Sequence, residues 1–115
     1  MERDYIKRDY SVSDDSHVYL TVEIGNAQVG GTAVMLNGNF VAKGEIRNLD
    51  LGKGSDLRDK GARVITTVSD INENTNTLVV KYIVTGGNQE MKEVRTLTVK
   101  EDGDAGRFTL ALVFN

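Results

Sequence analysis

The sequence predicts an all-β fold, a two-sheet antiparallel β-sandwich of about seven strands. Apolar and polar residues alternate strictly in several segments, turn-forming residues separate these segments, and no segment carries an apolar stripe at helical spacing. The 115 residues are enough for one domain. The expected architecture is immunoglobulin-like, and a Greek-key order of the strands is compatible with this pattern of elements. The likeness is architectural only, because the chain has no Cys and no Trp.

Alternation is clearest in segments 17–24 and 107–114. The first places four apolar residues on one face of a strand, namely Val18, Leu20, Val22 and Ile24. The second repeats the pattern with Phe108, Leu110, Leu112 and Phe114. Because successive side chains of a strand point to opposite faces of a sheet, both sets are expected to face the core.

A tight hairpin is predicted around Asn37 and Gly38. This dipeptide tolerates the positive φ angles that two-residue hairpin turns require. Segments 32–36 and 40–46 flank it and are rich in apolar residues. They are therefore expected to pair with each other.

Segments 62–69 and 77–85 are two more expected strands, rich in Val, Ile and Thr. Residues 70–76 separate them and consist largely of turn formers. The second strand is apolar on both faces, which predicts a central position in its sheet.

Segment 91–100 has a less regular pattern, because Val94 and Leu97 fall on opposite faces of an ideal strand. A β-bulge near Arg95 or Thr96 would restore the phase. With short loops on either side, the last four strands are expected to form a meander.

Residues 47–61 form the one long connection and are expected to carry the chain from one sheet to the other. Within it, Ser55 is a candidate N-cap for at most one helical turn.

Residues 1–15 differ in composition from the β-sandwich domain expected over residues 16–115. Charged side chains crowd around only four larger apolar residues, Tyr5, Ile6, Tyr10 and Val12. This segment is expected to be either a loose N-terminal arm or an edge strand, its own or donated to a partner. The chain has no Pro, so its sheet edges need charge, bulges or a covering segment to prevent uncontrolled pairing.

Strict alternation of strand direction would sort the loops to two ends of the sandwich. One end would then gather residues 37–39, 70–76 and 101–106, a set rich in carboxylate and amide oxygens. Clustered hard oxygen ligands are what Ca²⁺ requires. The candidate ligands are Asp70, Asn72, Asp102 and Asp104. An EF-hand is excluded, because its Gly position is Thr75 and its last ligand position is Lys81.

The sequence contains no recognisable catalytic constellation. It has no Cys and one His, His17, which lies on the polar face of its strand. The 14 basic and 17 acidic side chains are mixed along the chain, which favours neither nucleic acid nor a membrane surface as partner. No apolar run is long enough to span a bilayer.

Together these features predict a non-catalytic β-sandwich module that acts through its surface in protein binding or structural assembly. The alternative is a small-ligand or carbohydrate-binding module with an inter-loop calcium site, calcium being the only cofactor considered. The expected partner is a protein, and self-association through an edge strand or the N-terminal arm is a further expectation.

Overall fold

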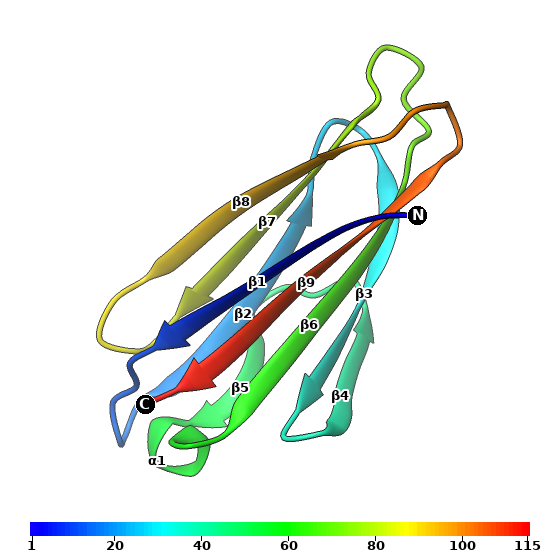
Figure 1. Ribbon diagram of the computed structural model, residues 1–115. Helices are drawn as coiled ribbons and strands as arrows, with labels where there is room; N and C mark the ends of the chain where they lie inside the picture. Colours follow the sequence, from blue (N-terminus) through cyan, green and yellow to red (C-terminus); the bar gives the residue numbers. More distant parts are fainter.

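Nine strands form two packed sheets in the computed structural model, which describes all residues 1–115 (Figure 1). The strands are β1 (Glu2–Tyr10), β2 (His17–Ile24), β3 (Val29–Leu36), β4 (Asn39–Gly44), β5 (Leu49–Lys53), β6 (Gly61–Ser69), β7 (Thr77–Thr85), β8 (Met91–Thr98) and β9 (Ala105–Phe114). One sheet has the order β1-β9-β6-β3-β4 and the other β5-β2-β7-β8. The protein is therefore an all-β sandwich, with nine strands rather than the seven predicted.

The first additional strand is β1, at the edge of the five-stranded sheet. It pairs in parallel with β9, from Glu2 opposite Gly106 to Tyr10 opposite Phe114, so the sandwich is not wholly antiparallel. Ile6 and Tyr10 point into the core, but Asp4 and Arg8 share their face of the strand. Because these two charged residues lie on the inner face, β1 lacks the alternation of apolar and polar residues by which a strand is recognised in a sequence.

The second additional strand is β5, which lies inside the predicted connection 47–61 and pairs antiparallel with β2. The connection thus carries the chain into the four-stranded sheet and back again. A single helical turn, α1 (Gly54–Leu57), follows β5 as predicted. Its N-cap is Lys53, without a side-chain cap, so the expectation for Ser55 was wrong. This helix has only four residues, and the chain contains no helix of the length and hydrophobicity that a membrane span requires.

Only β3–β4 and β7–β8 are hairpins within one sheet. The β3–β4 turn has positive φ angles at Asn37 (49°) and Gly38 (85°), as predicted. The predicted meander was wrong, because β7–β8 belongs to one sheet while β6 and β9 pair in the other. The central position of β7 between β2 and β8 is confirmed.

The predicted bulge in β8 is absent, because its register with β7 runs without interruption. Met91, Glu93, Arg95 and Leu97 form the more buried face of this strand, and Val94 is exposed. Two charged residues, Glu93 and Arg95, therefore lie on the inner face of this strand, which is why its apolar residues keep no single phase.

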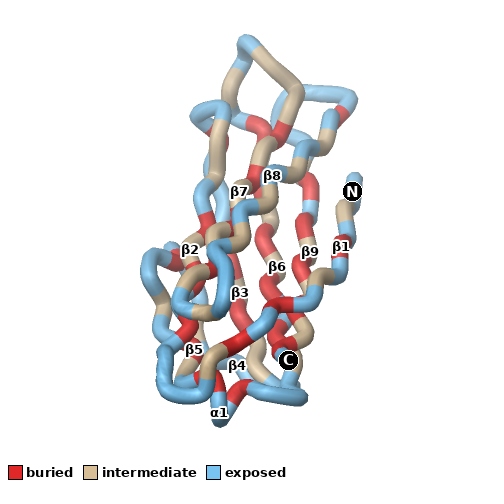
Figure 2. Tube along the Cα trace, turned by 90° about the vertical axis from the view of Figure 1, so that its left-hand side faces the viewer, coloured by how far each residue is buried: buried red, intermediate tan, exposed pale blue.

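The core lies between the sheets, and buried positions alternate with less buried ones along β6 and β9 (Figure 2). Val18, Leu20 and Val22 of β2 are buried, as predicted from their alternation. The four predicted residues of β9 are also buried, namely Phe108, Leu110, Leu112 and Phe114. These contacts hold the two sheets face to face.

One core residue carries an unpaired polar atom. Tyr82 of β7 is completely buried, and its hydroxyl group makes no hydrogen bond of ordinary length, because the nearby Thr66 hydroxyl is bonded to Thr32 at 2.8 Å. Burial, and after it the charge of Asp4, raises the pKa of Tyr82 above its ordinary value, so the hydroxyl stays protonated. A buried donor without an acceptor costs stability.

We therefore expect Tyr82→Phe to raise the free energy of unfolding by about 1–3 kcal/mol, measured by urea denaturation. Tyr10→Phe is the matched control, because the Tyr10 hydroxyl accepts a hydrogen bond from the Gly87 amide at 2.9 Å. That variant should lose stability. A loss in Tyr82→Phe would show that its hydroxyl finds a partner in solution.

Candidate functional site

The loops 70–76 and 101–104 meet at one end of the sandwich, as predicted. The Asp70 amide donates to the Asp104 carbonyl, and the Gly103 amide donates to the Asp70 carbonyl, both at 2.9 Å. The β3–β4 turn lies at the opposite end, beside α1, and the β2–β3 loop takes its place (Figure 1). The predicted assignment of the β3–β4 turn to this end was wrong, because β5 reverses the chain direction once more than we expected.

The four candidate calcium ligands are held in hydrogen bonds within and between these loops. Asp70 is 2% exposed, and its Oδ1 accepts from Gln28 Nε2 at 2.7 Å. The Asn76 amide nitrogen, oriented toward the carboxylates, lies 2.8 Å from Asp70 Oδ2 and 2.9 Å from Asp102 Oδ1. Asn72 Oδ1 accepts from the Asn74 amide, and Asp104 Oδ2 accepts from the Glu101 amide.

Gln28 connects the β2–β3 loop to the loop that follows β6, and sequence reasoning missed it. Its side chain is buried, and its Oε1 accepts from the amides of Ile71 and Asn72 at 2.7 and 2.8 Å. With its donor group on Asp70, one Gln satisfies three polar groups of the loop that follows β6. A single Gln between a turn and a strand carries no sequence signal for this role.

No group of three or more His, Cys, Asp or Glu side chains is placed to hold one metal ion. The calcium site therefore stays a prediction. Its test is a thermal melt with and without millimolar Ca²⁺, since an ion that binds only the folded chain raises the melting midpoint. An unchanged midpoint would reject the site. A rise that persists in the double variant Asp70→Ala, Asp102→Ala would reject it as well.

His17 is exposed at the outer surface of the four-stranded sheet, as the sequence pattern indicated. Its Nδ1 lies 2.9 Å from both carboxylate oxygens of Asp50 on β5. This hydrogen bond lowers the pKa of Asp50 below its ordinary value. The pair fastens β5 to β2 at a solvent-exposed edge.

A different surface stands out by its composition: the outer face, meaning the side chains of the five-stranded sheet that point away from the four-stranded sheet. The register places these side chains in rows that run across the strands. One row holds Arg3, Arg107, Thr67 and Gly31; the next holds Tyr5, Thr109, Ile65, Ala33 and Lys43; the third holds Lys7, Ala111, Arg63, Met35 and Phe40.

The outer face is basic although the chain is acidic overall. It carries five cations, Arg3, Lys7, Lys43, Arg63 and Arg107, and one acidic side chain, Asp9. All five cations are exposed, and none takes part in an ion pair. The rest of the molecule keeps nine of the 14 basic and 16 of the 17 acidic residues. Charge is therefore separated in space although it is mixed along the chain.

Apolar and aromatic groups lie between these cations. Tyr5 on β1 is 58% exposed and Phe40 on β4 is 70% exposed. A hollow of about 510 Å³ lies beside Tyr5 and is also lined by Lys7, Arg63 and Met35. The hollow forms where Gly61 and Ala111 leave the sheet surface without large side chains.

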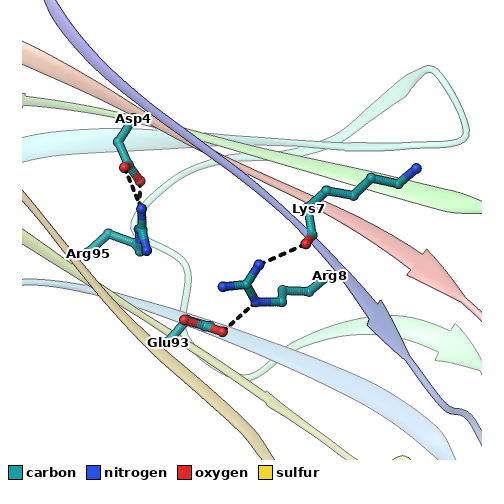
Figure 3. A network of polar contacts seen from close by, with 5 residues as sticks. All are labelled: Asp4, Lys7, Arg8, Glu93 and Arg95. Atoms are coloured by element: carbon teal, nitrogen blue, oxygen red, sulfur yellow. Dashed lines mark hydrogen bonds and ion pairs between the residues drawn. The ribbon is translucent and has the colours of Figure 1, made fainter.

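The placement of β1 on this face depends on two ion pairs on its inner side (Figure 3). Asp4 accepts from Arg95 Nε at 2.9 Å and from Arg95 Nη2 at 2.8 Å, and Arg8 Nε donates to Glu93 at 2.7 Å. They connect β1 to β8, so they join the edges of the two sheets. The hydrogen bond to Asp4 also raises the pKa of Arg95 above its ordinary value. Held in this way, β1 directs Arg3, Tyr5 and Lys7 outward.

We expect Arg95→Met to lower the free energy of unfolding by about 1–3 kcal/mol, because the Asp4 carboxylate, 14% exposed, would lose a two-point partner. Hydrogen exchange should report faster opening of β1 amides than of β6 amides. Lys92→Met is the control, because Lys92 and Glu90 form an exposed pair at 3.8 Å. Equal effects of the two variants would show that the β1–β8 contact contributes nothing special.

The chain matches no protein-family model, no curated protein and no solved structure. Its own surface is therefore what a functional proposal has to rest on.

Proposed function

We propose that this protein is a non-catalytic binding module that engages a partner protein through the outer face of its five-stranded sheet. The observation that carries the proposal is the combination of five unpaired cations with exposed Tyr5 and Phe40 on one continuous surface. Arg and aromatic residues are enriched at protein interfaces, where they supply much of the binding energy.

The residue types on this face support binding rather than catalysis. It holds no His, and Asp9 is its one carboxylate, so it offers few groups for acid–base chemistry. Its sheet backbone is pre-organised, and the small residues Gly61 and Ala111 leave room for a partner's side chains. A rigid surface loses little conformational entropy on binding.

Site-specific photo-crosslinking in the cells that produce the protein tests the proposal. Benzoylphenylalanine would replace Phe40 in one variant and Val94 in another, since both side chains are exposed but Val94 lies on the four-stranded sheet. We expect a protein adduct of defined mass from position 40 and none from position 94. Adducts from neither position, or the same adduct from both, would contradict the proposal.

Self-association through a sheet edge stays a prediction. In this structure β1 pairs with β9 of its own chain. The β4 edge is irregular, with a register shift opposite Val34 and Met35 and with exposed Lys43, features that discourage edge-to-edge pairing. Light scattering of the full chain and of a chain lacking residues 1–15 distinguishes an arm-mediated dimer from a monomer.

A further inference from the structure

We propose that the partner presents an acidic segment, in which Asp or Glu residues flank apolar ones, to the outer face. This inference rests on the proposed function, because it names the partner chemistry of the same surface. Four features of the face support it.

The first feature is that these cations are free. Elsewhere in the molecule five of the nine Lys and Arg side chains contact a carboxylate, namely Arg8, Arg47, Arg58, Lys92 and Arg95. The outer face leaves its five cations without such partners although acidic residues outnumber basic ones in the chain. Their guanidinium and ammonium groups remain available to external carboxylates, which guanidinium groups can bind through two parallel hydrogen bonds.

The second feature is a like-charge neighbour pair. Arg3 and Arg107 lie directly opposite each other on the adjacent strands β1 and β9. Adjacent strands are about 4.8 Å apart, and like charges at such positions destabilise a sheet. A bound carboxylate would relieve this repulsion.

The third feature is the arrangement of charge around an apolar centre. Ile65 and Ala33 occupy the middle of the second row. Arg107 lies one row to one side of them and Arg63 one row to the other. Arg107 pairs with Thr67, which is four residues from Arg63 along β6, so the two Arg positions are about 13 Å apart along the strand direction. A matching segment would carry two acidic groups at this separation with apolar side chains between them.

The fourth feature concerns the reach of the basic surface. It covers one face of a molecule that measures 46 × 24 × 20 Å and whose other surfaces carry 16 acidic and nine basic residues. Nucleic-acid-binding domains are usually strongly basic overall, whereas the pI of this chain is about 5.1. A local acidic segment fits the face, while a long polyanion would also meet acidic surfaces.

The test is a titration of the isotope-labelled full chain, followed by nitrogen–proton correlation spectra. The probe is a synthetic peptide of Glu-Asp-Leu-Ser repeats, and the control peptide has Gln and Asn in place of Glu and Asp. We expect the acidic peptide to shift amide signals of β9, β6 and β3, and the neutral peptide to leave them in place. Binding should weaken as NaCl is raised, because salt screens exposed charges.

Matched charge reversals locate the effect. The double variant Arg63→Glu, Arg107→Glu should weaken peptide binding at least about tenfold. The double variant Lys53→Glu, Lys100→Glu should change the affinity less than about twofold. Both double variants change the net charge equally, and all four side chains are exposed. Thermal melts of the variants confirm that each one folds.

Three outcomes would overturn the inference: no shifts with the acidic peptide, equal weakening by the two double variants, or tighter binding of oligo-dT or of phosphatidylserine vesicles to the same face. Crosslinking at position 40 separates these failures. A specific adduct there with no binding of the acidic peptide would preserve the binding face and reject its acidic partner. Absence of both would reject the proposed function as well.

Discussion

Replacing Leu110 with Ala is expected to lower the free energy of unfolding by about 2–5 kcal/mol. Leu110 is completely buried at the centre of β9, with Ile6 of β1 opposite on one side and Val64 of β6 on the other. Truncation would remove apolar contacts from all of these strands and leave a cavity that the surrounding sheets close only in part. Urea denaturation of the variant and the parent chain measures the loss.

Thr109→Ala is the control for this prediction. Thr109 is the preceding residue on the same strand, but its side chain points to the outer face and is only partly buried. Its loss should be below about 1 kcal/mol. Similar losses for both variants would mean that the two faces of β9 are assigned incorrectly.

Replacing Asp70 with Ala is expected to lower the free energy of unfolding by about 3 kcal/mol. The Asp70 carboxylate accepts hydrogen bonds from the side-chain amides of Gln28 and Asn76 in a buried position. Without it, the buried Gln28 amide loses its acceptor, and an unsatisfied buried donor costs about 1–3 kcal/mol, while the Asn76 amide keeps only its contact with Asp102. Thermal and urea denaturation check the size of the effect.

Asp102→Ala is the matched variant, because Asp102 contacts the same Asn76 amide from an exposed position. Its effect should stay below about 1 kcal/mol. If Asp102→Ala cost as much as Asp70→Ala, the end of the sandwich would depend on total negative charge rather than on one buried acceptor.

Local sequence patterns predicted the strands whose inner faces are apolar. Residues 17–24 and 107–114 alternate without interruption, and Asn37-Gly38 has the backbone freedom that its turn requires. Such signals are properties of neighbouring residues, so they are visible in one sequence. The same reasoning missed β1, whose inner face mixes Ile6 with Asp4 and Arg8, because only the ion pairs to β8 make these charges acceptable inside.

The predicted loop positions show how one missed element affects the whole topology. Because β5 was taken as part of a connection, every later loop was assigned to the wrong end relative to the Asn37-Gly38 turn. The pairing of loops 70–76 and 101–104 was still correct, since both follow the missed strand and shift together.

The sequence by itself determined the fold class, the hairpin at Asn37-Gly38 and the inward faces of β2 and β9, because each depends on residues close together in the chain. Only the tertiary structure decided where the charges lie. The five cations of the outer face are spread over the chain from Arg3 to Arg107, and acidic residues separate them along it. Strand pairing between distant segments, including the parallel β1–β9 pair, brings them onto one surface. These strands pair although they are far apart in the chain, so no local spacing could reveal this surface.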